Sequence, residues 1–223
     1  DTTIPTYPVT STLTMTSDED RTFIDIVGDV TEVLLNGHPH PFEDEEDRVW
    51  VAGLPVGEPI TLEVRALARY SRSGEGLHRY TDPEDGEVYL YTQFEPNDAH
   101  RAWPCIDQPD VKPEWTFHVI APAGWVVSSN GIETGVESVG ETGALRHDFT
   151  ATRPLSSYIT AIVAGPWAVI EGGTWSGGAS DGGHAELELR LLCRRTLARY
   201  LDFDDVFEVT RAGLDFFHER YGV

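Results

Sequence analysis

The chain has 223 residues, 40% of them hydrophobic and 10% aromatic, and carries a formal net charge of −22. This apolar content suffices for a packed core, which excludes global disorder. The negative charge repels phosphate backbones and anionic lipids, and no apolar run approaches the roughly 18 residues of a membrane span, so we expect neither a nucleic-acid nor a membrane partner.

Alternation of apolar and polar residues predicts strands over most of the chain. In residues 61–70, Leu62, Val64, Ala66 and Ala68 share one face, which is typical of a half-buried antiparallel strand. Similar alternations at 115–119 and 187–191, and β-rich runs at 88–94 and 158–163, predict further strands.

Turn residues separate these runs. Asn36-Gly37, Asn130-Gly131 and the segment 82–86 (DPEDG) predict tight turns, and the glycine-rich stretch 172–183 predicts a mobile surface loop. Together with the strands, they predict an all-β fold, an antiparallel saddle or sandwich over residues 1–193.

The apolar period changes from two to that of a helix after Arg194. Val206, Val209 and Phe217 fall on one stripe, Asp204 is the expected N-cap, and Gly222 is the expected residue after the helix. We therefore expect two parts: residues 1–193, a β domain, and residues 194–223, a linker and the first helix of a second domain that is cut short.

The acidic run and the cysteines favour simple roles. Residues 43–47 (EDEED) predict a solvated loop, because adjacent carboxylates diverge rather than converge on a metal. Cys105 and Cys193 do not make a disulfide framework, so we expect two free thiols and a cytoplasmic protein.

The segment 91–110 combines a polar-faced strand with a proline-rich loop. Tyr91, Gln93 and Glu95 share one face, which is unusual for a β core. From the residues alone, this face either meets solvent or lines a binding site. Pro96, Pro104 and Pro109 stiffen the loop that follows, as is common at recognition sites.

Four stretches in order resemble the aminopeptidase N-type zinc metallopeptidases, which are gluzincin aminopeptidases. They are 70–79 (YSRSGEGLHR), 92–110 (TQFEPNDAHRAWPCIDQPD), 121–131 (APAGWVVSSNG) and 155–158 (LSSY). The first is similar to the actinobacterial branch of the family. The resemblance runs from about residue 33 to the end of the chain, and the family's first strands are expected to precede Asp1.

The resemblance implies an amino-terminal β-saddle domain followed by a thermolysin-like zinc domain. The family's Gly-Ala-Met-Glu-Asn and His-Glu-x-x-His motifs are absent from the sequence, so no catalytic residue and no zinc are expected in this chain, which is expected to be inactive alone. His218-Glu219 is not such a motif, since Gly222 occupies the position of the second His.

One role is implied by position within the resemblance. Glu95 matches the family's Glu that pairs with the α-ammonium of a peptide substrate, and Gln93 matches a Gln that lines the same pocket. The resemblance also implies a cis peptide between Glu95 and Pro96. We expect Arg101 and Asp107 to brace the loop, and the histidines to be surface or ordinary core residues.

Two other functions stay open. The chain could belong to a non-catalytic scaffold or binding module that keeps this fold, or to an epoxide-hydrolysing relative. An intact Gln93 and Glu95 pair argues against the scaffold, because a scaffold has no need of an ammonium receptor. Partners expected for the aminopeptidase are a peptide amino terminus and the chain's own catalytic domain.

Overall fold

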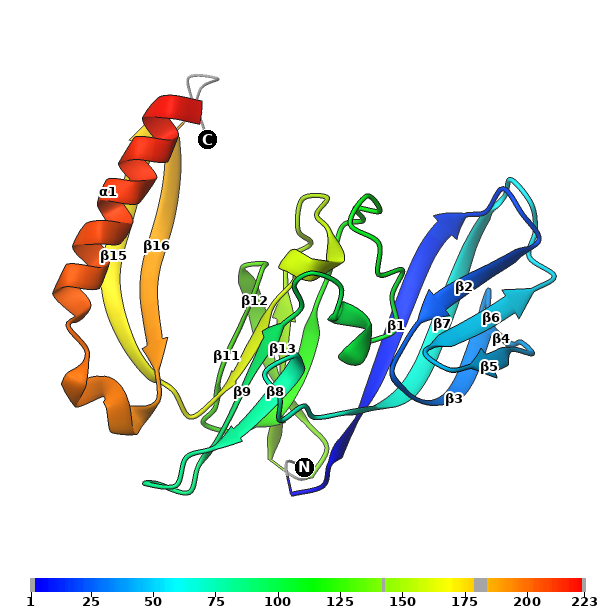
Figure 1. Ribbon diagram of the computed structural model, residues 1–223, viewed down its shortest axis with the longest axis horizontal. Coiled ribbons are helices and arrows are strands. Elements are labelled where there is room, and N and C mark those ends of the chain that lie inside the picture. The colour runs from blue at the N-terminus through cyan, green and yellow to red at the C-terminus, as the bar shows by residue number, and fades with distance from the viewer. Residues whose placement is uncertain (1–2, 142, 179–183, 222–223) are drawn as a thin grey trace. The chain divides into compact units, whose positions relative to one another are not determined.

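The computed structural model describes residues 3–141, 143–178 and 184–221 (Figure 1). Contacts divide the chain into two compact units, Asp1–Thr81 with Val88–Gly165, and Asp82–Glu87 with Pro166–Val223. The described part is mostly antiparallel β-sheet with one α-helix near the end of the chain, which confirms the predicted all-β fold class. The expected boundary between residues 193 and 194 stays a prediction.

The first part of the first unit is built from two sheets, in the orders β1-β7-β3-β4 and β2-β6-β5. Their strands are β1 (Thr6–Thr16), β2 (Arg21–Asp25), β3 (Gly28–Leu35), β4 (His38–Pro39), β5 (Glu43–Glu45), β6 (Arg48–Ala52) and β7 (Pro59–Arg69). β1 and β7 pair along their whole length, from Thr6 opposite Arg69 to Thr16 opposite Pro59.

β7 has the two faces that its sequence predicts. Leu62 and Val64 are fully buried, and they pack with Ile24 and Val49 in the core of this part. Each such aliphatic side chain contributes about 1.5–3 kcal/mol by leaving water. The acidic run is solvated as expected, although residues 43–45 form the edge strand β5 rather than a loop.

The second part of the first unit contains the sheets β11-β14-β9-β8 and β10-β13-β12. The elements are β8 (Gly76–Thr81), β9 (Val88–Gln93), η1 (Ala99–Arg101), β10 (His118–Pro122), β11 (Val126–Ser129), β12 (Glu133–Val139), β13 (Ala144–Phe149), η2 (Ser157–Ile159) and β14 (Ile162–Gly165). Their shared core contains Leu90, Phe94, Trp103, Phe117 and Phe149.

Two predicted strands begin later than their alternation suggested. β10 starts at His118, because the Trp115 N–H donates to Thr152 Oγ1 and its indole N–H to the Leu155 carbonyl instead of joining a ladder. Tyr158 lies in η2, and the strand that follows starts at Ile162.

The two Asn-Gly pairs behave differently. Asn36 and Gly37 have φ of 50° and 79°, as in a type I′ hairpin turn between β3 and β4. Asn130 instead uses its side chain: its Nδ2 donates to the Ile159 carbonyl at 2.9 Å and its Oδ1 accepts from the Ala161 N–H at 2.6 Å. The second pair is therefore a bridge to η2 and not a hairpin turn.

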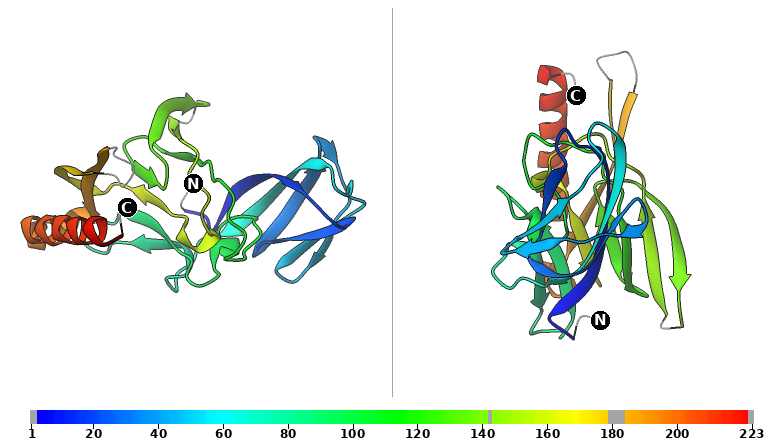
Figure 2. Two further views of the ribbon diagram at one scale, coloured as in Figure 1. Left: turned by 90° about the horizontal axis from the view of Figure 1, so that it is seen from above. Right: turned by 90° about the vertical axis from the view of Figure 1, so that its right-hand side faces the viewer.

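The second unit consists of a hairpin, a 3₁₀ segment and a helix; Figure 2 shows the helix alongside the hairpin. Its elements are β15 (Ala168–Gly178), β16 (His184–Cys193), η3 (Arg195–Tyr200) and α1 (Phe203–Tyr221). The turn 82–87 belongs to this unit, where the Asp82 carboxylate accepts hydrogen bonds from Arg194 at 2.9 Å and Thr196 at 2.7 Å.

The glycine-rich stretch is a strand over part of its length, which corrects the predicted loop. Residues 172–178 lie in β15, and residues 179–183 are outside the described residues. Glycine is needed at residue 172 because an added Cβ would lie 2.3 Å from the Phe207 ring of α1. Gly172 thus allows α1 to pack closely against β15.

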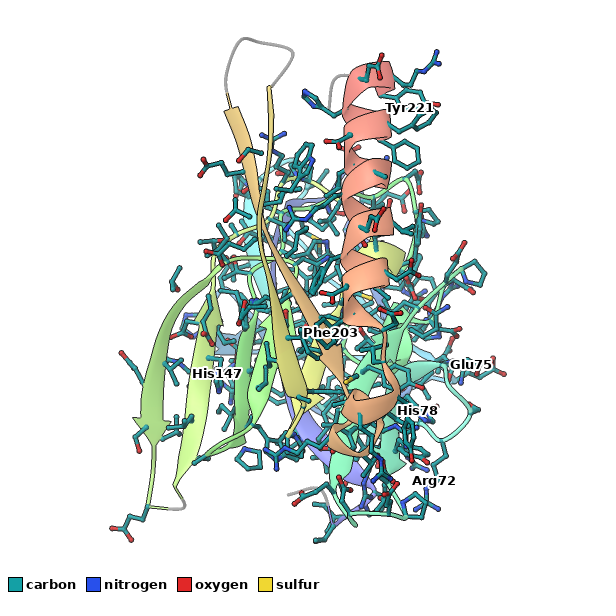
Figure 3. The ribbon with its side chains drawn as sticks, turned by 90° about the vertical axis from the view of Figure 1, so that its left-hand side faces the viewer. Arg72, Glu75, His78, His147, Phe203 and Tyr221 are labelled. Carbon is teal, nitrogen blue, oxygen red and sulfur yellow. The ribbon has the colours of Figure 1, made fainter. Side chains whose placement is uncertain are left out.

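Helix α1 begins one residue before the predicted N-cap. Phe203 is its first residue, and the Asp205 N–H donates to Asp202 Oδ1 at 3.3 Å, so Asp202 and not Asp204 is the N-cap. Gly222 is outside the described residues. Phe203 and Tyr221 mark the two ends of the helix in Figure 3. Among the described helices, none combines the length and apolar character needed to cross a membrane.

Candidate functional site

The polar face of β9 is exposed to solvent, and a binding role remains open to it. Gln93 and Glu95 are exposed and Tyr91 is 38% exposed, whereas Phe94 on the other face is only 1% exposed. The strand therefore has a buried apolar side and a polar side that meets solvent. Exposure alone does not separate a binding face from an ordinary surface, so the surroundings of Glu95 decide what it can do.

Glu95 lies in a short loop with fixed ends. The peptide bond between Glu95 and Pro96 is cis, as predicted. The Asp98 N–H donates to the Phe94 carbonyl at 2.8 Å, which closes the loop. Phe94 is held in turn by an edge-on contact with Trp103, with ring centroids 4.9 Å apart. The Glu95 carboxylate consequently projects from a loop of defined position.

Arg101 braces this loop, as predicted. Its Nε donates to Asp98 Oδ1 at 2.6 Å. Across the sheet, Gly76 pairs with Gln93, and an added Cβ on Gly76 would lie 2.9 Å from the Arg101 Cβ. Gly76 also has φ of +65°, so a larger residue here would be strained and would displace Arg101.

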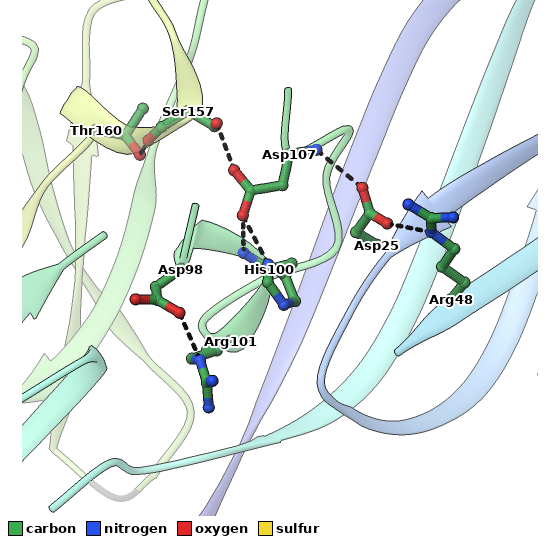
Figure 4. A network of polar contacts seen from close by, with 8 residues as sticks. All are labelled: Asp25, Arg48, Asp98, His100, Arg101, Asp107, Ser157 and Thr160. Atoms are coloured by element: carbon green, nitrogen blue, oxygen red, sulfur yellow. Dashed lines mark hydrogen bonds and ion pairs between the residues drawn. The ribbon is translucent and has the colours of Figure 1, made fainter. Parts of the chain in front are cut away.

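Asp107 braces the end of the same loop, also as predicted (Figure 4). Its Oδ2 accepts the His100 N–H at 3.1 Å and lies 2.7 Å from His100 Nδ1. Its Oδ1 accepts the Ser157 hydroxyl at 2.5 Å, and its backbone N–H donates to Asp25 Oδ2 at 3.1 Å. The Asp107 side chain is only 3% exposed.

The contact between His100 and Asp107 shifts the pKa of both side chains. The hydrogen bond to Asp107 is the main cause that raises the pKa of His100 above its usual value, and the charges of Asp107 and Asp25 add to it. Burial by itself would raise the pKa of Asp107, but hydrogen bonds from His100 and Ser157 outweigh burial and lower it. Both shifts favour an ion pair at neutral pH.

Two neighbours of the strand were not singled out from the sequence. His78 lies opposite Tyr91 on β8, with ring centroids 5.0 Å apart, and its Nδ1 accepts the Gly74 N–H at 3.1 Å. His100 was expected to be an ordinary surface or core histidine, yet it pairs with Asp107. No sequence signal joins His100 to Ser157, since the two reach the same carboxylate from segments far apart in the chain.

The described residues do not fit a zinc ion. Among residues 3–141, 143–178 and 184–221, no three His, Cys, Asp or Glu side chains converge as a metal site. His218 packs its ring against Trp175, with centroids 5.7 Å apart. Cys105 and Cys193 are free, as predicted, and burial raises the pKa of the Cys105 thiol.

The described residues thus form antiparallel sheets with a hydrogen-bonded loop at the end of the polar-faced strand β9. A family model, the Peptidase M1 N-terminal domain, matches residues 24–159. The chain belongs to this family.

Named relatives agree with this assignment. The chain is 39% identical over 204 residues to the aminopeptidase N of Streptomyces lividans, covering 90% of this chain and 22% of that protein. It is 33% identical over 226 residues to the probable M1 family aminopeptidase 1 of Encephalitozoon cuniculi, covering 87% of this chain and 24% of that protein. The chain thus spans about a quarter or less of these relatives.

A solved structure shows the same fold. The crystal structure of Legionella pneumophila aminopeptidase A in complex with aspartic acid matches 97% of this chain and 25% of that chain, with a TM-score of 0.79 and 18% identity. At this identity the likeness supports the architecture and not the chemistry.

Proposed function

We propose that this chain is the amino-terminal domain of a zinc aminopeptidase, a hydrolase that removes amino-terminal residues from peptides. In this proposal, Glu95 binds the substrate's α-ammonium group and Gln93 lines the same pocket. The observation that carries the proposal is the Glu95 carboxylate, exposed on a loop closed between Phe94 and Asp98. Membership of the Peptidase M1 N-terminal domain family supports it.

The electrostatics suit this role. A carboxylate and an ammonium about 4 Å apart attract by roughly 4 kcal/mol at an effective dielectric near 20, before desolvation costs. A peptide amino terminus has a pKa of about 7.7–8.0 and is therefore mostly cationic at neutral pH. Internal peptide bonds offer no such cation, so a receptor of this kind selects cleavage at the end of the chain.

Zinc would be held outside the described residues, since those residues do not fit it. The proposal therefore assigns the ligands and the water-activating groups to the rest of a longer protein, and we expect the 223-residue chain alone to be inactive. Helix α1 would begin that catalytic domain. Its exposed apolar residues, including Val209 at 65%, Phe217 at 53% and Tyr221 at 71%, suit burial against further chain.

We also propose that the protein acts in the cytoplasm, in the breakdown of peptides. The two free cysteines support a reducing compartment. The net charge of −22 supports a peptide partner with a cationic terminus rather than nucleic acid or an anionic membrane.

The test is a charge-removing substitution in the longer protein. Glu95→Gln should lower kcat/KM for aminoacyl 4-nitroanilides by about 100-fold, as expected for loss of a desolvated charge partner. Glu87→Gln is the matched control, because Glu87 is an exposed acid just before β9. Equal kinetics for wild type and Glu95→Gln would remove Glu95 from the site.

A further inference from the structure

We propose that Asp107 is a positioning residue for Glu95, holding the loop that carries Glu95 through His100 on one side and Ser157 on the other. This inference rests on the proposed function of Glu95. In this inference, the buried Asp107 carboxylate does not touch the substrate. It determines the position of Glu95, which binds the substrate's ammonium group.

The two oxygens of Asp107 hold different segments. Oδ2 receives the backbone N–H of His100 at 3.1 Å and lies 2.7 Å from the His100 ring, which belongs to η1. Oδ1 accepts a hydrogen bond of 2.5 Å from the hydroxyl of Ser157, which belongs to η2. The side chain is 3% exposed, so water competes little for these contacts.

A short path joins His100 to Glu95. Asp98, two residues before His100, donates its N–H to the Phe94 carbonyl at 2.8 Å and thereby closes the loop over Glu95. The His100 carbonyl in turn accepts the Val27 N–H at 2.8 Å. Movement of His100 away from Asp107 would therefore shift the closing end of the Glu95 loop.

A second path reaches the strand before Glu95. Ser157 lies in η2, which leads to Ile162 at the start of β14. The Ile162 N–H donates to Thr92 Oγ1 at 2.9 Å, one residue before Gln93. Asp107 thus holds both the strand that leads to Glu95 and the loop that follows it.

The surrounding charges make the interaction with His100 specific. Asp25 also faces this cluster and is paired with Arg48 at 2.9 Å, and Arg101 is paired with Asp98 at 2.6 Å. Asp107 is accordingly the carboxylate that pairs with the His100 ring. An asparagine at residue 107 would keep the shape of the side chain but remove its negative charge.

The experiment is a double-mutant cycle in the longer protein with Asp107→Asn, Glu95→Gln and the double variant, using aminoacyl 4-nitroanilides. Asp107→Asn alone should raise KM about tenfold and lower kcat less than threefold. In the Glu95→Gln background it should change KM less than twofold, because the group it positions is gone. Asp44→Asn, an exposed acid on β5, is the control.

Each outcome decides a different claim. If Glu95→Gln leaves the kinetics unchanged, the proposed function fails and this inference with it. If Glu95→Gln is damaging but Asp107→Asn is silent, or the two effects multiply, only the positioning role is overturned. Should Asp107→Asn not fold, Ser157→Ala, which removes a single contact, takes its place in the cycle with the same expected coupling.

Discussion

The Nδ1 of His100 lies 2.7 Å from the Oδ2 of Asp107, inside the loop that begins at Glu95. Because the hydrogen bond to Asp107 raises the pKa of His100 above 6.5, the folded chain favours protonated His100. The stability this provides is fully present below about pH 6.5 and is lost as pH rises through the raised pKa.

We therefore expect the free energy of unfolding to separate wild type from His100→Gln most strongly at about pH 6 and less at about pH 9. The difference at low pH should not exceed the ~1.5–3 kcal/mol of a charged hydrogen bond. Urea unfolding across this pH range measures it. His38→Gln is the control, since His38 is exposed on β4. If the difference in the free energy of unfolding between wild type and His100→Gln does not change with pH, the stabilising ion pair between His100 and Asp107 is contradicted.

Replacement of Glu95 should leave the stability of the chain nearly unchanged. Its side chain is exposed, so Glu95→Ala should alter the free energy of unfolding by no more than about 0.5 kcal/mol. Phe94→Ala, one residue earlier, should cost about 3–5 kcal/mol, because Phe94 is 1% exposed and fills the core. Urea unfolding of both variants measures this difference. A large loss in the free energy of unfolding of Glu95→Ala would show that Glu95 contributes to folding.

Gly172 should tolerate no side chain. Gly172→Ala would place a Cβ 2.3 Å from the Phe207 ring, so we expect a loss of about 1–3 kcal/mol from overpacking between β15 and α1. Gly213→Ala, inside α1 with nothing within 4 Å of its added Cβ, should instead stabilise the chain by about 0.5–1 kcal/mol. The unfolding temperatures of the two variants should shift in opposite directions. Equal shifts would refute the close approach of Phe207 to Gly172.

Asn130 should contribute through its side chain. Asn130→Ala removes hydrogen bonds to the Ile159 carbonyl and the Ala161 N–H, so the loss should be about 1–2 kcal/mol. Asn97→Ala, at an exposed position, is the comparison. If a turn conformation were what mattered at residue 130, Asn130→Gly would preserve stability; we expect it to be as damaging as Asn130→Ala.

Particular elements show how far sequence reasoning reached. Period-two alternation predicted β7 because the side chains of a strand alternate between core and solvent, and Leu62 and Val64 are indeed fully buried. The same reasoning placed a strand too early at Trp115, because side-chain hydrogen bonds to Thr152 and backbone bonds outside any ladder compete with pairing there. The loop predicted over residues 172–183 was wrong at residues 172–178, which lie in β15, and at residue 172 the small size of glycine makes room for the Phe207 ring of α1.

The sequence by itself determined the all-β class, the two-sided character of β9 and the resemblance that selects Glu95 and Gln93, because these follow from local alternation and from residues close together in the chain. Only the tertiary structure decided which groups the Asp107 carboxylate and backbone meet. Asp107 bonds Ser157 and Asp25, which are 50 and 82 residues away along the chain. Such contacts depend on how the strands pair and pack, and no local pattern of residues encodes which partner a buried carboxylate will meet.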